Sequence, residues 1–539
     1  MAGGLLNLVA MGTQNIIING NPSKTFFKMK YAKHTNFGLQ KFRIDYDGLR
    51  TLRLNEDSHF RFKIPRYADL LMDTYVLMTL PMIWSPVYTN SDNEQIPYEF
   101  QWIENIGTEM IREISITSGG QKIQTYSGSY IRSIVERDFD AHKKNHFNEM
   151  TGNVTELKYP AEAFGRLRRY PSALPSNSES GSHPSIDGRK IYIPLMAWFG
   201  SSSKMSFPLV ALQYNELHIN VTFRPVSELF TIRDVKNKAE GYPRIQPNFN
   251  NDYMLLHRFL QSPPSIELNP EDFIEKRNNW NSDIHLMSTY GFLSDEESRL
   301  FAAQEQKYLF KEIHEYKFLN ITGSKRIEVE TNGLVSSWMF YFQRSDIKLR
   351  NQWSNFSNWP YHTLPQNIRS IIDNNGLTIN TSLSLSEIGE IHSTGEYFHG
   401  NKKEILQEFG ILLDGNYREN ILPAGIFRYL EPFSRSKGNP IDGLYFYNFC
   451  LNTDVFEHQP SGAINLNKFG KVELEVVTYI PPLDPNAQFL NICDGDGTII
   501  GVNKPSWSIY DYNYDMTLIE ERYNILSFIG GNCGLLYSN

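Results

Sequence analysis

Pro208-Leu-Val-Ala-Leu-Gln-Tyr-Asn-Glu-Leu-His-Ile-Asn-Val-Thr-Phe223 is echoed much later in the chain by Pro460-Ser-Gly-Ala-Ile-Asn-Leu-Asn-Lys-Phe-Gly-Lys-Val-Glu-Leu-Glu-Val-Val-Thr-Tyr479. In both stretches a proline-led turn runs into a strand with alternating apolar residues. Three pairs align before the strand, Pro208 with Pro460, Ala211 with Ala463 and Asn215 with Asn467, and after an insertion Val221-Thr222 aligns with Val477-Thr478. The separation is far too long for a solenoid repeat, so the echo predicts one β domain used twice.

The composition is that of a soluble globular protein built mainly from strands. The chain has 539 residues, of which 40% are hydrophobic and 21% charged, so it can bury two or more cores. Aromatic residues reach 13%, and they favour strands over helices. The net charge of −8 argues against a dedicated nucleic-acid-binding protein, which would show a basic stripe.

Cysteine usage and the N-terminal segment bear on the compartment. The three cysteines, Cys450, Cys493 and Cys533, are widely spaced, which favours a reducing compartment over a disulfide framework. Residues 1–12 lack the basic and long apolar regions of a signal peptide. No apolar run approaches the roughly 18 residues of a spanning helix.

Strand signals recur along the chain, and they favour an all-β fold. Phe60, Phe62 and Ile64 alternate with charged residues, and residues 113–124 read as a hairpin turning at Gly119-Gly120. Many short strands with long crossovers predict β-sandwiches of the jelly-roll kind. Ile16-Ile-Ile-Asn-Gly-Asn-Pro22 is expected to be a short strand ending in a turn.

These signals divide the chain into four parts. We expect an N-terminal arm over residues 1–24, a first jelly roll over 25–224, a polar linker or insertion over 225–281, and a second jelly roll over 282–539 that includes a C-terminal strand. Long exposed loops are expected at 145–188 and 351–420, where the sequence is polar.

No motif in the sequence predicts catalysis or a cofactor. The chain has no zinc-protease motif, phosphate-binding glycine loop or nucleophile elbow. Asp494-Gly-Asp-Gly-Thr498 lacks the later ligands of a calcium loop and is read as a turn, and no metal site is expected. Among the Asn-x-Ser/Thr sequons, Asn153, Asn355 and Asn380 are the candidate glycosylation sites, although unmodified asparagine is the preferred interpretation.

Several segments resemble one known family. They are the opening Met1-Ala-Gly-Gly-Leu5, residues 20–37 with Gly20-Asn-Pro22 and His34-Thr-Asn-Phe37, Pro208–Tyr214, Gln459–Gly462, Tyr523–Leu526 and Gly534–Asn539. Together they resemble the major capsid proteins of nucleocytoplasmic large DNA viruses, in the chlorella-virus and mimivirus-like branch.

The resemblance implies two consecutive eight-stranded antiparallel jelly rolls per chain and a non-enzymatic, structural role in the virion. It implies a homotrimer of pseudo-hexagonal outline that tiles the faces of an icosahedral shell, assembled in the host cytoplasm. The partners would be neighbouring trimers, minor capsid and penton proteins and the inner membrane side of the shell, with no specific nucleic acid and no cofactor. The apolar Leu5, Leu6, Leu8 and Val9 of the arm are the candidate assembly contacts.

Two other classes remain open at the level of sequence. A glycan-binding jelly-roll module, either lectin-like or a receptor-attachment protein, would stack sugars on exposed aromatic residues such as Trp353 and Trp359. A cupin-type enzyme would need a His/Glu metal cluster, which the spacing of these residues does not supply.

Overall fold

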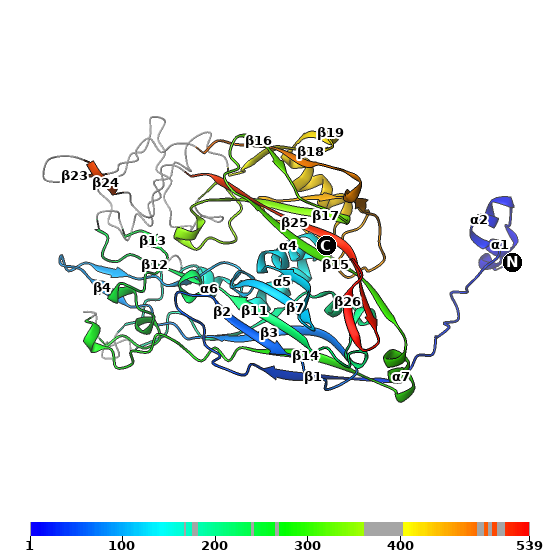
Figure 1. Ribbon diagram of the computed structural model, residues 1–539, viewed down its shortest axis with the longest axis horizontal. Coiled ribbons are helices and arrows are strands. Elements are labelled where there is room, and N and C mark those ends of the chain that lie inside the picture. Colours follow the sequence, from blue (N-terminus) through cyan, green and yellow to red (C-terminus); the bar gives the residue numbers. More distant parts are fainter. Residues whose placement is uncertain are drawn as a thin grey trace.

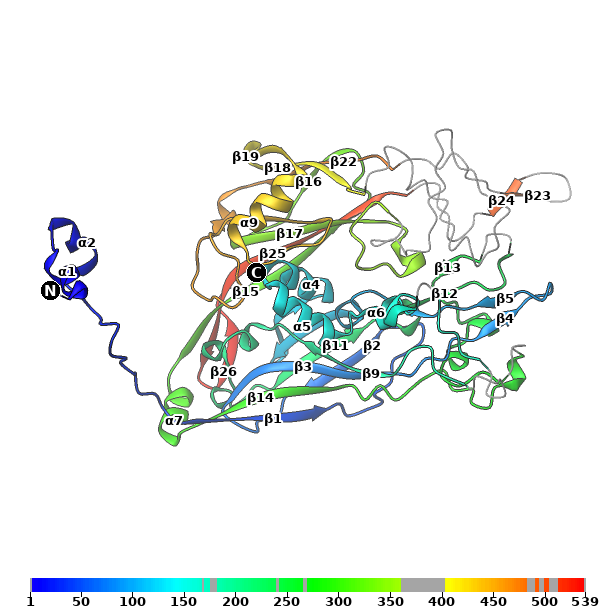
Figure 2. The same ribbon diagram turned by 180° about the vertical axis from the view of Figure 1, so that it is seen from behind.

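The protein consists of two antiparallel β-sandwiches that lie side by side, with short helices between them (Figure 1). The computed structural model describes residues 2–166, 169–174, 182–238, 242–264, 269–359, 403–481, 490–493, 499–503 and 512–537. The N-terminal arm leaves the body near the first strand and extends away from it (Figures 1 and 2). No helix among these residues is long and apolar enough to cross a membrane.

The first sandwich has two sheets whose inner faces share one apolar core. One sheet has the order β1-β14-β3-β10, with β9 also paired to β3, and the other has the order β2-β11-β7-β8. The strands are β1 (Phe37–Asp45), β2 (Ser58–Lys63), β3 (Leu70–Leu80), β7 (Ile111–Ser118), β8 (Gln121–Tyr126), β9 (Arg189–Pro194), β10 (Phe207–Pro208), β11 (Leu217–Phe223) and β14 (His285–Leu293).

Alternation of residue type sets which face of these strands is buried. In β2, Phe60 and Phe62 are buried, whereas the alternate residues His59, Arg61 and Lys63 are exposed. Strand β11 alternates in the same way along its whole length. The predicted alternation in both stretches is confirmed.

The second sandwich repeats this arrangement. Its sheets have the orders β15-β25-β17-β20 and β16-β22-β18-β19, with β21 paired to β17 and β26 to β25. The strands are β15 (Gln306–Phe318), β16 (Ser324–Glu328), β17 (Leu334–Arg344), β18 (Leu406–Leu413), β19 (Asn416–Pro423), β20 (Leu444–Asn448), β21 (Ile464–Asn465), β22 (Val472–Thr478), β25 (Tyr514–Ile529) and β26 (Asn532–Leu535).

Strand order is the same in both sandwiches. In each, the first strand pairs with the last, the last pairs with the third, and the second pairs with the strand that follows the echoed turn. Apart from the short strands β10, β21 and β26, each sandwich has four strands in each sheet. The prediction of a double jelly roll is confirmed.

The echoed segments fall on equivalent elements of the two rolls. Strand β10, a 3-10 turn at Leu209–Ala211 and β11 correspond to β21, a 3-10 turn at Leu466–Lys468 and β22. The residue-by-residue alignment is wrong, however, because Pro208 lies within β10 whereas Pro460 precedes β21. The repeat is one of architecture, with little of the sequence retained.

The expected boundary of the second roll at residue 282 is wrong. Strand β14 pairs along its whole length with β1, from Phe37 opposite Leu293 to Asp45 opposite His285, and it also pairs with β3. It is therefore the last strand of the first roll, and the second roll begins after helix α7 (Asp295–Ala303). An apolar strand carries no local signal of which sheet it will join, so the sequence misplaced it.

The segment 225–281 is not a linker. Its strands β12 (Phe230–Arg233) and β13 (Arg244–Ile245) join β6 (Gln101–Trp102) in a small sheet. Phe230, Leu256 and Phe259 are fully buried in the core of the first roll. These apolar residues are spaced among prolines, asparagines and charged residues, which hid their role in the core.

The expected exposed loop at 145–188 is wrong in its first part. Helix α5 (Ala141–Thr151) and the short helix α6 (Thr155–Lys158) occupy it, and Phe147 and Leu157 are buried. Likewise, β18 and β19 occupy the end of the expected loop at 351–420, while 360–402 lie outside the described residues. The remaining elements include α3 (Ile106–Glu109), α4 (Gly128–Asp138), α9 (Glu431–Arg435) and the strands β4 (Val87–Thr89), β5 (Gln95–Pro97), β23 (Leu490–Cys493) and β24 (Ile499–Asn503).

Candidate functional site

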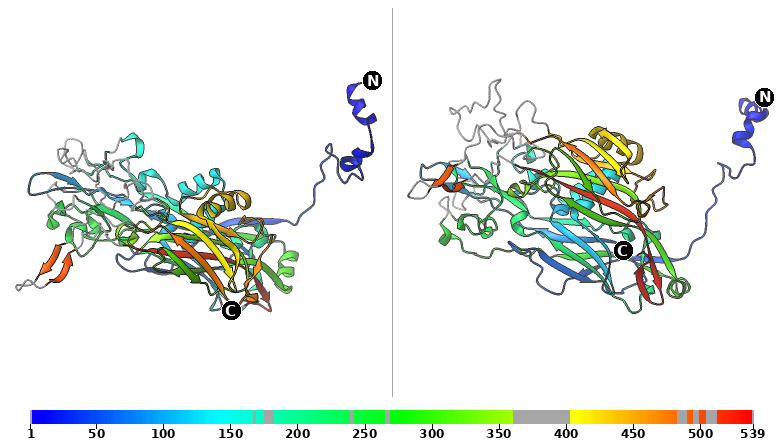
Figure 3. Two further views of the ribbon diagram at one scale, coloured as in Figure 1. Left: turned by 90° about the horizontal axis from the view of Figure 1, so that it is seen from above. Right: turned by 45° about the horizontal axis from the view of Figure 1, so that its top comes forward.

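The N-terminal arm presents apolar side chains that the rest of the described chain does not cover. It holds α1 (Gly3–Val9) and α2 (Ile16–Asn19), neither of which contains a buried residue. The four candidate contacts are exposed, Leu5 and Leu6 by about half and Leu8 and Val9 by about 70%. Figure 3 shows the arm standing clear of both sandwiches in two further views. Helices this short are not stable alone in water, so the arm is suited to ordering on another surface.

The arm differs from the sequence expectation in one element, and a group of lysines follows it that the sequence analysis did not use. Ile16–Asn19 forms a helical turn, so the expected short strand there is wrong. Four lysines, Lys24, Lys28, Lys30 and Lys33, follow this turn, and no acidic residue precedes Asp45. This run of positive charge was visible in the sequence and was missed, because the charge of the whole chain is negative.

A second site joins the two rolls through a buried charged cluster. Helix α4 of the first roll lies against the β15-β25-β17-β20 sheet of the second (Figure 1). Arg137 at its C-terminal end is completely buried; its Nη2 donates to Glu521 Oε1 at 3.0 Å and its Nη1 to Glu521 Oε2 at 3.2 Å. Arg137 also forms a two-pronged pair with the adjacent Asp138, at 2.8 and 2.9 Å.

Further groups complete the hydrogen bonds of this junction cluster. Lys311 Nζ and Ser337 Oγ donate to Glu521 Oε2 at 3.0 and 2.8 Å, and Thr453 Oγ1 donates to Asp138 Oδ1 at 2.8 Å. Burial acts to raise the pKa of Glu521, but the charges of Arg137 and Lys311 outweigh it and hold that pKa well below its usual value. The carboxylate is therefore ionised, and its charge is compensated by groups from both rolls.

Apolar contacts and one helix cap extend the junction. The core of the first roll continues into the second through Ile313, Met339, Phe446 and Ile519. Glu315 of β15 accepts a hydrogen bond from the Ser127 backbone N–H at 2.8 Å, at the N-terminus of α4. The two rolls therefore share a continuous buried interface, which fixes their relative orientation.

The two candidate glycosylation asparagines in the described part of the chain, Asn153 and Asn355, both make side-chain hydrogen bonds within the fold. Asn355 is 1% exposed, and its side chain donates to the Trp359 carbonyl at 2.8 Å. Asn153 donates to Asn105 Oδ1 at 2.8 Å and is half-buried. Neither amide nitrogen is free for a glycan in the folded chain. Asn380 and the turn at 494–498 lie outside the described residues.

The aromatic platforms that a glycan-binding protein needs are not found at the two expected tryptophans. Trp353 donates through Nε1 to the Glu228 carbonyl at 3.0 Å, and Arg224 lies over its ring at 4.1 Å. Trp359 is half-buried, with Lys403 over its ring at 5.4 Å. Both rings pack within the protein, which disfavours the glycan-binding alternative.

Comparisons with known proteins agree with this architecture. Residues 25–255 match the family model of the major capsid protein N-terminus, and residues 297–534 match that of the large eukaryotic DNA virus major capsid protein. The second match begins after β14, in agreement with the corrected boundary between the rolls.

Similar proteins span the whole chain. The major capsid proteins of Phaeocystis pouchetii virus and Paramecium bursaria Chlorella virus 1 are each 22% identical to it, with 100% of both chains covered. A solved structure of the PBCV-1 virus capsid has a TM-score of 0.60 at 17% identity, covering 96% of this chain and 100% of that one. The Faustovirus major capsid protein has a TM-score of 0.57 at 11% identity, covering 93% and 92%. Since both family models match in chain order and each covers most of one of the two rolls, the chain belongs to the family of major capsid proteins of large eukaryotic DNA viruses.

Proposed function

We propose that three copies of this chain form a ring-shaped trimer of pseudo-hexagonal outline, and that such trimers tile the faces of an icosahedral shell. The observation that carries the proposal is the shared strand order of the two rolls. A three-fold ring places one face of each protomer against a different face of its neighbour. Because each protomer supplies two rolls of one architecture, three protomers supply six similar wedges around the axis.

The buried junction supports this arrangement. Six wedges keep a fixed outline only if the two rolls of a chain cannot rotate against each other. The Arg137–Glu521 pair and the apolar contacts around Met339 and Ile519 oppose such rotation, since sliding would leave buried charges unpaired.

The arm is proposed to act beneath the trimer, as a contact for minor capsid and penton proteins and for the inner membrane side of the shell. Its exposed leucines support this role because the rest of the described chain does not cover them, and the four lysines at 24–33 add positive charge where the arm joins the body. Burying four such apolar side chains contributes on the order of 1.5–3 kcal/mol each before the entropy of ordering the arm is subtracted.

The proposed role is structural, without catalysis or a cofactor, and the protein acts in the virion. Synthesis and assembly are proposed to take place in the host cytoplasm. The free thiols of the buried Cys450 and Cys533 support a reducing site of assembly.

Light scattering on the purified full-length protein tests the trimer. A mass three times that of one chain, unchanged over a tenfold dilution, is the expected result. A stable monomer at the highest concentration contradicts the proposal.

A further inference from the structure

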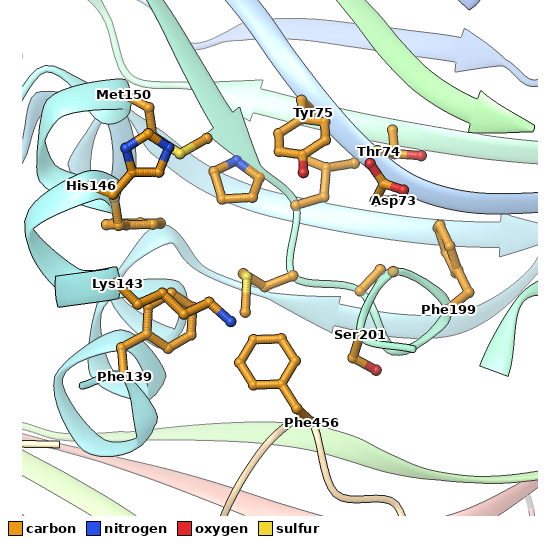
Figure 4. A pocket seen from close by; sticks show the side chains of 16 residues that line it. Asp73, Thr74, Tyr75, Phe139, Lys143, His146, Met150, Phe199, Ser201 and Phe456 are labelled. Carbon is orange, nitrogen blue, oxygen red and sulfur yellow. The ribbon is translucent and has the colours of Figure 1, made fainter. Parts of the chain in front are cut away.

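A cavity of about 300 Å³ opens beside the junction of the two rolls (Figure 4). Helix α5, the residue after α4, strand β3 and the segment after β9 form its walls, and the second roll contributes Phe456. Four phenylalanines, Phe139, Phe147, Phe199 and Phe456, are among the lining residues, together with polar residues such as Asp73 and His146. The volume is about ten times the ~30 Å³ of one water molecule, and it lies at the small end of ligand pockets.

One cation faces this cavity without an anionic partner. The Lys143 ammonium lies 3.3 Å from the centre of the Phe456 ring and 4.5 Å from that of Phe139, and Figure 4 shows it pointing into the cavity. No ion pair or hydrogen bond of this ammonium to another described residue is found. Lys143 as a whole is exposed to solvent; partial desolvation of its ammonium lowers the pKa of Lys143, and the charges of Asp454 and Asp140 act in the opposite direction.

Three neighbouring lysines at the junction, unlike Lys143, each form an ion pair with a carboxylate. Lys144 pairs with Glu136, Lys437 with Asp454 at 2.5 Å, and Lys311 with Glu521 at 3.0 Å. Asp454 and Asp140 attract the Lys143 ammonium without forming an ion pair with it. Asp454 pairs with Lys437, and Asp140 accepts a hydrogen bond from the Lys143 backbone N–H at 2.8 Å. The cavity therefore combines a lining rich in phenylalanine with an ammonium that has no ion pair at one wall, while Asp73 places a carboxylate at another.

We propose that this cavity binds a small amphiphilic monocarboxylate of about ten non-hydrogen atoms. The carboxylate pairs with the Lys143 ammonium, and the hydrocarbon body lies against the phenylalanine rings. Pairing gives the ammonium a counter-charge, and the hydrocarbon body is removed from water when it lies against the rings. Asp73, on strand β3 at a different wall of the cavity, disfavours a ligand that carries a second anionic group (Figure 4).

Calorimetric titration of the full-length protein with octanoate tests the proposal. Octanoate is expected to bind saturably, whereas 1-octanol, octylammonium and octanedioate bind at least several-fold more weakly. Lys143→Gln is expected to weaken octanoate binding by about tenfold or more, because a charge-assisted hydrogen bond is lost, and Lys143→Arg retains most of the affinity.

Two further variants separate binding from folding. Lys190→Gln makes the same charge change on exposed β9, outside the cavity, and leaves octanoate binding unchanged. Met150→Trp reduces the space at the end of α5 without changing the charge and weakens octanoate binding while the thermal midpoint is retained. Equal affinity for octanoate and 1-octanol, unchanged octanoate binding in Lys143→Gln, or no saturable binding to the wild-type protein overturns the proposal.

Discussion

Arg137 forms hydrogen bonds to residues of both rolls and so links them at their junction. Its guanidinium is fully buried and its partners come from both rolls, so removing it leaves the buried Glu521 carboxylate with less compensating charge. The sequence could not indicate this pair, because its members are 384 positions apart and neither lies in a recognisable motif.

Replacing Arg137 by methionine is expected to cost about 3–5 kcal/mol of unfolding free energy, as breaking a buried ion pair does. Urea unfolding followed by fluorescence measures the loss. Arg53→Met is the matched control, since Arg53 pairs with Glu56 on the surface and its loss is expected to stay within about 0.5 kcal/mol. Equal effects of the two substitutions would show that the junction pair does not stabilise the fold.

Asp442 is expected to make the stability of the fold depend on pH in a defined direction. Burial acts to raise its pKa, but hydrogen bonds from Lys403 and Arg428 and their charges lower it to about 2. The folded pKa lies below the usual value of about 3.9, so the contribution to stability is complete above that value and is lost as the pH falls through about 2.

The difference in stability between wild type and Asp442→Asn is therefore expected to be constant from pH 7 to about 5 and to shrink between about 4 and 2. Urea unfolding at each pH measures it. A difference that grows on acidification would contradict the assigned pKa direction.

At the scale of elements, local chemistry predicted some features and could not predict others. The hairpin of β7 and β8 was predicted from Gly119-Gly120, and both glycines have positive φ, at 57° and 86°. The arm contacts were expected from the apolar residues of the N-terminal segment and from the family resemblance, and they stay a prediction. The sheet to which β14 belongs and the burial of 225–281 depend on pairing between distant segments, so no local pattern could reveal them.

The first residue of helix α4, Gly128, is expected not to tolerate a larger side chain. A Cβ added to Gly128 would lie 1.8 Å from the Thr108 carbonyl oxygen, so Gly128→Ala forces the backbone of α3 and α4 apart. We expect a loss of about 1–3 kcal/mol or more. Thermal unfolding measures it against Gly425→Ala, where the nearest atom is at 3.6 Å and no loss is expected. If Gly128→Ala is as stable as the control, the start of α4 does not approach the Thr108 carbonyl oxygen this closely.

At the scale of the whole molecule, the arm and the body are expected to have separable roles. Deleting residues 2–24, or replacing Leu5, Leu6, Leu8 and Val9 by serine, is expected to leave folded trimers and to abolish shell formation, because no residue of the arm is buried in the body. Sedimentation and electron microscopy of the expressed particles measure the two properties. Asn7→Ser, in the same helix, serves as the control and is expected to assemble normally. Loss of the folded trimer on deletion would show that the arm belongs to the core.

Three chains can form a six-lobed ring only if each chain supplies two equivalent rolls that are rigidly joined. Electron-microscopic averaging of the purified protein, viewed along its symmetry axis, tests this most directly. We expect a three-fold particle with six lobes of similar size arranged in a near-hexagonal ring. A particle with three lobes, or with two rolls whose relative orientation varies from image to image, contradicts it.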